Sequence, residues 1–182
     1  MKKTKKTVLE EMFFAGFGGQ GIMFMGKLLA HAGLSAGLNI TWMPSYGAEV
    51  RGGTAYSMTK ISDSEIPGPV VARPDILVVM NRPSLLKYAS AVKDGGVIIS
   101  NRSLAGDVPK PKGKVFVNIP MTEIAYKLGD VKCANMVAIG ALAKRSRLVS
   151  LKDISAALKT AFKDKEELYA RNRIALMKGY KW

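Results

Sequence analysis

The sequence predicts an α/β protein: a single three-layer domain in which helices cover a mostly parallel sheet and the C-terminal segment is helical. Three observations predict this fold. Short apolar runs alternate with segments of helical periodicity. The run Asp75–Met80 (D-I-L-V-V-M) has the continuous hydrophobicity of a strand covered on both faces. From Met121 onwards the periodicity is helical only. The length of 182 residues fits one domain spanning residues 1–182.

The first elements form a strand, a glycine-rich turn and a helix. Met12–Ala15 is a short apolar run before a glycine cluster, which indicates a buried strand. Apolar residues then recur at spacings of three and four, which predicts a helix over residues 21–36. Leu38–Met43 is predicted as a second strand that Pro44 ends, and residues 55–61 alternate as a third strand would.

The remaining elements follow the same alternation. Residues 62–74 contain three prolines, which indicates an irregular connection. A helix is expected from Pro83 to Val92, and residues 101–113 are expected to be a polar connection. The other expected elements are strands at 75–80, 96–100 and 115–119 and helices at 122–128, 135–144, 151–162 and 165–177, of which the third should begin at Ser150 with Asp153 three residues later.

Composition excludes several classes of site. The chain has one cysteine and one histidine, too few for a zinc site, an iron–sulfur cluster or a disulfide framework. No apolar run reaches the roughly 18 residues of a membrane span, and no secretory signal is recognised at the N-terminus, so a cytoplasmic protein is expected. Lys and Arg number 28 against 14 acidic residues. The resulting charge of +14 favours polyanionic or acidic partners, but no nucleic-acid-binding signature accompanies it.

The first motif is the run G-F-G-G-Q-G at residues 16–21. Gly16, Gly18 and Gly21 satisfy the pattern G-x-G-x-x-G between a predicted strand and a predicted helix. Glycines permit a tight turn and a close approach of the backbone to a ligand, and the helix start offers free N–H groups to an anion. A glycine turn made for packing alone is the competing interpretation.

A dinucleotide held in the usual way is not expected. Such a ligand needs an acidic residue about 20 residues after the motif to hold its ribose. Residues 38–43 (L-N-I-T-W-M) contain none, and Glu49 falls in the next loop. A free-standing nucleotide-binding enzyme remains the alternative hypothesis.

The second motif is the loop P-S-Y-G-A-E-V-R-G-G at residues 44–53. Arg51 has the planar guanidinium that pairs with carboxylate or phosphate groups. Glu49 would orient Arg51 or accept hydrogen bonds from a ligand, unless the two simply stabilise the turn. Elsewhere, Lys27 would lean toward a phosphate on the glycine loop or lie in solvent. His31 has no predicted role, and Cys133 is expected to be a buried structural residue.

Taken together, these motifs resemble the gamma subunit of the 2-oxoacid:ferredoxin oxidoreductases. The resemblance rests on both loops, on A-R-P-D-I-L-V-V-M-N at 72–81, on D-G-G-V-I-I-S-N at 94–101 and on the helical tail from C-A-N-M-V-A-I-G-A-L. It spans about residues 9–178. The S-Y-G-A-E-V-R-G-G form is most similar to the 2-oxoglutarate and branched-chain types.

The resemblance implies an oxidoreductase acting on the oxo group of donors, with an iron–sulfur protein as acceptor. Such enzymes decarboxylate a 2-oxoacid to an acyl-CoA, here 2-oxoglutarate by expectation. Thiamine diphosphate, Mg and the Fe–S clusters would belong to partners, namely alpha and beta subunits and a ferredoxin-like delta subunit or domain, with ferredoxin as acceptor. Neither nucleic acid nor a membrane is an expected partner, and the isolated chain should be inactive.

The resemblance also implies which residues meet coenzyme A, while assigning no catalytic residue and no metal ligand to this chain. The loop facing the phosphates would consist of Gly16, Gly18, Gly19, Gln20 and Gly21, and the loop facing the ligand or a neighbouring subunit would consist of Tyr46, Glu49, Arg51, Gly52 and Gly53.

Overall fold

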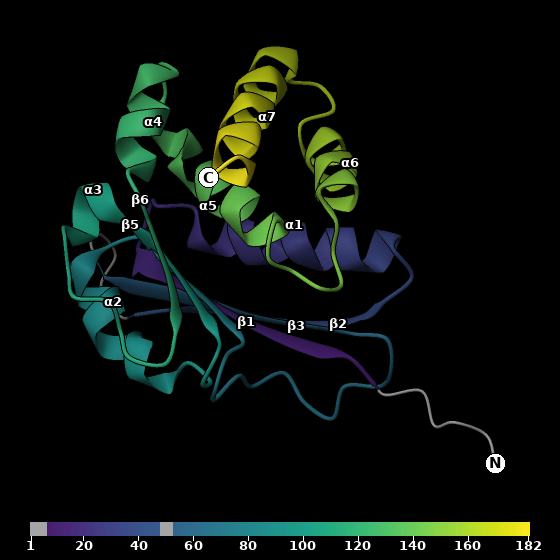
Figure 1. Cartoon of the computed structure of the whole chain (residues 1–182). Helices are drawn as coiled ribbons and strands as arrows, with labels where there is room; N and C mark the ends of the chain where they lie inside the picture. The colour runs from purple at the N-terminus through teal and green to yellow at the C-terminus, as the bar shows by residue number, and fades with distance from the viewer. Residues whose placement is uncertain (1–6, 48–52) are drawn as a thin grey trace.

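The structure, a computed structural model, describes residues 7–47 and 53–182. One six-stranded sheet with the order β2-β3-β1-β4-β5-β6 lies at the centre, and helices cover both of its faces (Figure 1). The pairs β1–β4, β4–β5 and β5–β6 are parallel, whereas β3 runs antiparallel to both of its neighbours. The predicted three-layer α/β fold with a helical C-terminal segment is confirmed.

The first strand and helix organise the sheet. β1 (Leu9–Phe17) lies between β3 (Thr54–Ser62) and β4 (Ile76–Val79). All four residues of β4 are buried, as its unbroken apolar run predicted. After β1, α1 (Ile22–Ser35) leads to β2 (Asn39–Tyr46) at one edge, whereas the chain after β4 leads to β5 on the other side. The topology therefore switches direction between β1 and β4.

The prediction that Pro44 ends the second strand is wrong. β2 continues to Tyr46, and Pro44 pairs with Ser57 of β3. Proline cannot donate a hydrogen bond to a neighbour, but β2 is the edge strand of the sheet and has a neighbour on one side only. β2 and β3 form a hairpin, so this part of the sheet departs from strict alternation of strands and helices.

The middle of the chain differs from expectation in two places. The helix predicted over 83–92 ends earlier, because its last part tightens into a 3-10 turn, and a helical turn lies in the segment predicted to be a polar connection. The elements of this region are α2 (Arg82–Tyr88), the 3-10 turn η1 (Ala89–Ala91), β5 (Val97–Asn101), α3 (Arg102–Ala105) and β6 (Val115–Ile119).

The C-terminal helices build two tiers over one face of the sheet. α5 is buried along its whole length and lies between the sheet and α7, while α6 packs against α1 (Figure 1). The predicted start of α6 at Ser150 is confirmed, because Ser150 and Asp153 cap each other reciprocally. The bounds are α4 (Met121–Lys127), the 3-10 turn η2 (Val131–Cys133), α5 (Ala134–Ala143), α6 (Leu151–Ala161) and α7 (Glu166–Tyr180).

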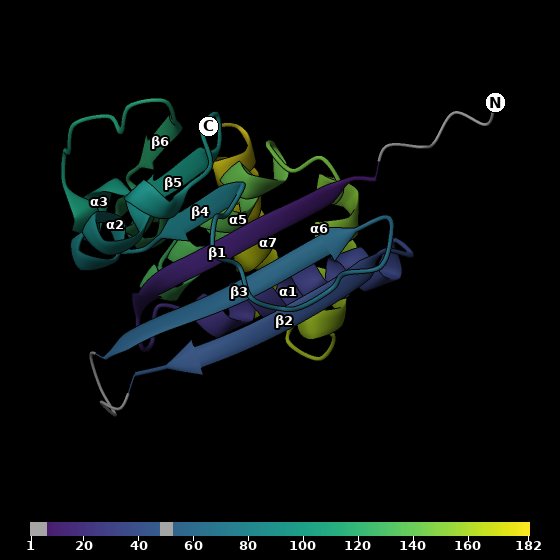
Figure 2. The ribbon, with the colours of Figure 1, turned by 90° about the horizontal axis from the view of Figure 1, so that it is seen from below.

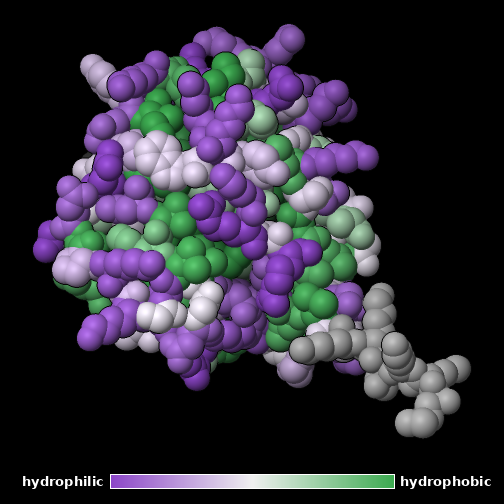
Figure 3. All heavy atoms as spheres, viewed as in Figure 1, coloured by the Kyte–Doolittle hydropathy of each residue, from purple (hydrophilic) through white to green (hydrophobic). Residues whose placement is uncertain are grey.

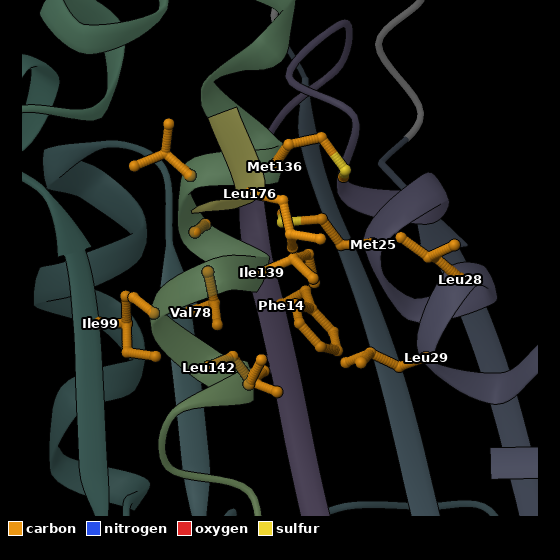
Figure 4. Packing of buried hydrophobic residues seen from close by; sticks show 14 of the residues in the cluster. Phe14, Met25, Leu28, Leu29, Val78, Ile99, Met136, Ile139, Leu142 and Leu176 are labelled. Carbon is orange, nitrogen blue, oxygen red and sulfur yellow. The ribbon is translucent and has the colours of Figure 1, made fainter. Parts of the chain in front are cut away.

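The main core fills the space between the sheet and these helices. Phe14, Val78 and Ile99 point up from the strands toward Met25 of α1 and Ile139 of α5 (Figure 4). A smaller cluster under the other face joins the sheet to α2, α3 and the segment after β3. Each fully buried large side chain contributes roughly 1.5–3 kcal/mol, so the core fixes the positions of the loops around it.

The carboxyl ends of the parallel strands share one side of the molecule. In the view from below, β1, β4 and β5 all run toward the side that carries α2 and α3, and at the same end of the sheet β2 ends and β3 begins (Figure 2). Hydrophilic residues cover most of the face seen in Figure 3, with hydrophobic residues in patches between them. Among the described residues, no helix is long and apolar enough to cross a membrane.

Candidate functional site

The glycine loop between β1 and α1 has a backbone that needs glycine at two positions. Gly19 and Gly21 have φ angles of 91° and 74°, in the left-handed region that residues with a Cβ avoid. The turn is closed by Gln20 N, which donates to Phe17 O at 3.2 Å. Gly18 has no described atom within 4 Å of a Cβ built there and an ordinary φ. Packing of the described residues therefore does not explain Gly18, which leaves room for a ligand or partner.

The first turn of α1 has no side-chain cap. Gly21 is its N-cap, so no side chain caps the helix, and the first turn contains no acidic residue. The first N–H groups of a helix have no acceptor within the helix, and the aligned peptide dipoles make this end partly positive. A phosphate or carboxylate would be stabilised here.

A crevice of about 180 Å³ lies beside this loop, at the carboxyl ends of β1, β4 and β5. Open α/β sheets bind ligands at such a switch point. Lys132 contributes a positive charge to the crevice, and Leu104 and Val131 form an exposed apolar rim. Its lining consists of Gly19, Gln20, Met80, Asn101, Leu104, Thr122, Val131, Lys132 and Ala134.

A larger hollow of about 290 Å³ lies elsewhere, between α1 and α6. Lys27 and His31 line it, so Lys27 does not face the glycine-loop crevice. The hollow combines a mostly apolar floor with exposed polar side chains and lies away from the strand ends. We therefore place the candidate site at the smaller crevice, where the topology, the open helix end and Lys132 coincide.

Two buried asparagines lie at the ends of β4 and β5, and one of them, Asn101, lines the crevice. Asn101, which is fully buried at the end of β5, donates from Nδ2 to Thr122 Oγ1 at 2.9 Å and accepts from Thr122 N at 3.4 Å. Asn81 follows β4 and caps α2 by accepting from Ser84 N at 2.9 Å. Sequence reasoning assigned no role to these residues. The sequence pattern that could have revealed them is an asparagine directly after each of the predicted strands 75–80 and 96–100.

The second loop lies next to the first. Gly18 N donates to Gly53 O at 3.2 Å, and Gly53 is buried. Tyr46 pairs with Ala55, which in turn pairs with Gly16, so the hairpin end and the glycine loop share one end of the sheet. The side chain of Tyr46 is exposed. The other predicted members of this loop, Glu49, Arg51 and Gly52, lie outside the described residues.

Gly21 also has a packing role. A Cβ at Gly21 would collide with the Nδ2 atom of Asn135, so the missing side chain lets the start of α5 approach the start of α1. The Oδ1 atom of Asn135 is buried and has no hydrogen-bond partner among the described residues. Asn135 is thus a polar residue beside the loop whose hydrogen-bonding capacity is not fully used by those residues.

Cys133 is buried, as expected, and is not an activated nucleophile. Burial raises the pKa of its thiol, and the nearby Asp130 carboxylate raises that pKa further. Among the described residues, no group of three or more His, Cys, Asp or Glu side chains is arranged to hold a metal ion.

The sheet order argues against a dinucleotide held in the usual way. In that arrangement the strand after the first helix lies beside the first strand and carries the ribose-binding acid. Here the antiparallel β3 separates β2 from β1. The end of β2 reads Ser45-Tyr46 and offers no acid.

Comparison with known proteins identifies the family. The model of the family described as pyruvate ferredoxin/flavodoxin oxidoreductase matches residues 11–182. The chain belongs to this family. The match includes both loops and every lining residue of the crevice.

Two relatives show how the family domain occurs. A 2-oxoglutarate synthase subunit, KorC, of Methanocaldococcus jannaschii is 36% identical over 186 residues, covering 99% of this chain and 97% of the relative. A ketoisovalerate oxidoreductase subunit, VorA, of Methanothermobacter thermautotrophicus is 38% identical over 92% of this chain. This chain spans only 35% of that relative. The family domain therefore occurs both alone and as part of longer chains.

Solved structures show the same arrangement. A keto/oxoacid ferredoxin oxidoreductase gamma subunit from Geobacter sulfurreducens superposes with a TM-score of 0.81 at 28% identity, covering 94% of this chain and 96% of that chain. A 2-oxoglutarate:ferredoxin oxidoreductase from Magnetococcus marinus, solved with 2-oxoglutarate, coenzyme A and succinyl-CoA, has a TM-score of 0.86 at 27% identity. The match covers 95% of this chain and 30% of the Magnetococcus chain.

Proposed function

We propose that this chain is the gamma subunit of a 2-oxoacid:ferredoxin oxidoreductase that converts a 2-oxoacid, with coenzyme A, to an acyl-CoA. The proposed substrate is 2-oxoglutarate, because the relative of equal length is named a 2-oxoglutarate synthase subunit. Residues 1–182 would act as one domain of the complex, located in the cytoplasm. The free-standing nucleotide-binding alternative has no observation in its favour, since the ribose-binding geometry is missing.

The observation that carries the proposal is the glycine loop at the uncapped start of α1, beside a crevice that Lys132 lines. Coenzyme A bears a diphosphate and a 3′-phosphate, and each needs hydrogen-bond donors and positive charge. The uncapped start of α1 supplies the donors, and Lys132 supplies the charge. Gly18 offers open space for close approach. Tyr46, Glu49, Arg51, Gly52 and Gly53 would face the ligand or a neighbouring subunit.

The redox groups must come from partners. One cysteine cannot bind an iron–sulfur cluster, which needs about four thiolates. The proposal therefore requires alpha and beta subunits with thiamine diphosphate and Mg, and a ferredoxin-like delta subunit or domain that passes electrons to ferredoxin. The excess of 28 basic over 14 acidic residues suits both coenzyme A and an acidic electron carrier.

The test is purification of the tagged chain from its own host, followed by a viologen-reduction assay with several 2-oxoacids. We expect larger thiamine and iron–sulfur subunits to co-purify, and reduction to require both a 2-oxoacid and coenzyme A. The 2-oxoacid that gives the highest kcat/KM identifies the substrate. A chain that purifies alone and inactive under anaerobic conditions would refute the proposal.

Two substitutions test the ligand contacts. Lys132→Ala should raise the KM for coenzyme A by about three- to tenfold, the cost of one exposed charge-assisted contact. Lys127→Ala is the matched control, because Lys127 is equally exposed on α4 but does not line the crevice. Arg51→Ala should likewise weaken acyl-CoA formation while the fold is kept. Unchanged coenzyme A kinetics would make Arg51 a structural or interface residue.

A further inference from the structure

The hydrogen-bond ladder between β1 and β4 stops at the glycine loop. Ala15 pairs with Val79, and Met80 N donates to Ala15 O at 2.9 Å. In a continuing parallel ladder the next bond would run from Phe17 N to Met80 O, since N–H and C=O groups alternate between the strands. That bond is replaced by a side chain.

The carboxamide of Gln20 is inserted between the two strands. Phe17 N donates to Gln20 Oε1 at 2.7 Å, and Gln20 Nε2 donates to Met80 O at 3.4 Å. The amide thus presents one acceptor to β1 and one donor to β4, as a peptide group would. Asn81 Nδ2 donates to the same Oε1 atom at 3.2 Å, which ties the start of α2 to the insertion.

Gly16 makes the insertion possible. A Cβ at Gly16 would lie 2.5 Å from Gln20 Oε1, 2.7 Å from Ile22 Cδ1 and 3.1 Å from the Cβ of Met80. All three contacts are closer than the 3.4 Å of ordinary van der Waals contact, and the closest is the one to the Gln20 carboxamide. Gly16 has an ordinary φ and sits within β1, so its role is to give space to Gln20 rather than to turn the chain.

The insertion has two consequences for the crevice. The amide lies between β1 and β4 at the switch point, where the crevice lies. It also fixes the loop on both sides, because Gln20 N closes the turn to Phe17 while its side chain is bound to both strands. Both polar ends of the carboxamide have partners in the protein, and the loop and α1 offer their backbone N–H groups to a ligand.

We propose that Gln20 is a positioning residue that acts as a spacer in the sheet, and that Gly16 is the residue that admits it. This inference rests on the proposed function, since the ligand positioned is coenzyme A. Without the spacer, the strands would close toward each other and the loop would lose the conformation in which its N–H groups face the phosphates.

Two variants test this by different routes. Gln20→Leu keeps much of the side-chain volume but removes both hydrogen-bonding ends, and Gly16→Ala displaces the carboxamide without removing a polar group. In the assembled enzyme each should raise the KM for coenzyme A about tenfold, the effect of losing roughly one net hydrogen bond, with kcat changed less than twofold. Gly68→Ala is the control for glycine substitution, because its Cβ would meet no atom within 4 Å. A KM and kcat equal to those of the wild type in both variants would overturn the proposal.

Hydrogen exchange on the isolated chain tests the spacer independently of catalysis. In Gln20→Leu the protection of the Phe17 amide against hydrogen exchange should fall at least about tenfold. The protection of the β5 amides should not change. Equal protection of Phe17 in the two proteins would overturn the spacer. If the activity of the wild-type complex did not depend on coenzyme A, the proposed function would be wrong. The exchange rate of the Phe17 amide would then be the measurement that decides whether Gln20 holds the strands.

Discussion

The contact between α5 and α7 gives a quantitative test of the packing that supports the site. Two glycines face the opposite helix: a Cβ at Gly140 would collide with the Leu176 carbonyl oxygen, and a Cβ at Gly179 would collide with the Val137 carbonyl oxygen. The atoms in the way are backbone, so they cannot rotate aside. The two helices therefore approach each other through reciprocal glycine contacts, and α5 begins at the wall of the crevice.

The cost of Gly140→Ala follows from these contacts. Tyr180 N lies 2.7 Å from the added Cβ, short of the 3.4 Å of ordinary contact, so the helices must separate by about 0.7 Å or more. Overpacking of this kind costs roughly 1–3 kcal/mol and sometimes more. The gain from replacing a helical glycine by alanine offsets about 1 kcal/mol of that. Because the Leu176 carbonyl oxygen is closer to the added Cβ than Tyr180 N is, the overpacking cost should lie at the upper end of this range, which leaves a net loss of about 2 kcal/mol.

Urea and thermal unfolding, followed by circular dichroism, measure this loss. For a chain of this length, about 2 kcal/mol corresponds to a fall in Tm of about 4–8 °C. Gly179→Ala should cost a similar amount, and the double variant should cost less than the sum, because the first separation relieves the second collision. Gly68→Ala serves as the control, with stability close to that of the wild type. A Gly140→Ala protein as stable as the wild type would refute the close approach of the two helices.

Three further predictions concern single groups. Burial alone would raise the pKa of Glu11, but hydrogen bonds from Lys93 and Lys60 outweigh it and lower that pKa below its usual 4.5. The stability that Glu11 contributes should therefore be present above about pH 4.5 and be lost as pH falls below that value, and Glu11→Gln should reduce this acid-induced loss of unfolding free energy; equal slopes below pH 4.5 in the two proteins would contradict this. Ser150→Ala should cost about 1 kcal/mol, measured by urea unfolding, because Asp153 N loses the acceptor that caps α6; an unchanged midpoint would count against the cap. The thiol of Cys133 should react with iodoacetamide only as fast as the protein opens, because it is buried and its pKa is raised; rapid labelling under native conditions would disprove its burial.

Local sequence patterns were sufficient to predict most of the helices and strands. The all-apolar run of β4, the threefold and fourfold spacing in α1 and the Ser150–Asp153 pair were each interpreted correctly, because a strand, a helix and a cap depend on residues close together in sequence. The wrong predictions concern segments whose structure depends on a neighbouring strand or helix. Pro44 is tolerated within β2 only because β2 is an edge strand, and the edge is a property of the whole sheet.

In the candidate site, too, the features that are local in sequence were predicted, and those that depend on distant contacts were not. The glycine run at residues 16–21 was recognisable, and its lack of a ribose-binding acid excluded the usual dinucleotide arrangement. The sequence placed Gln20 among the residues that meet the ligand, whereas its carboxamide is bound to Phe17 and Met80. Asn101 and Lys132 were not assigned to the site, since each is distant in sequence from the glycine loop.

By itself the sequence determined the alternation of strands and helices, the position of the glycine loop and the absence of enough cysteines for a cluster. Only the tertiary structure decided that β3 inserts antiparallel beside β1, that the carboxamide of Gln20 bonds between β1 and β4, and that Lys132 lines the crevice beside the loop. The physical reason is that periodicity reports which face of an element is buried. It does not report which other element covers that face, because strand order and side-chain neighbours across the sheet depend on contacts between residues far apart in the chain.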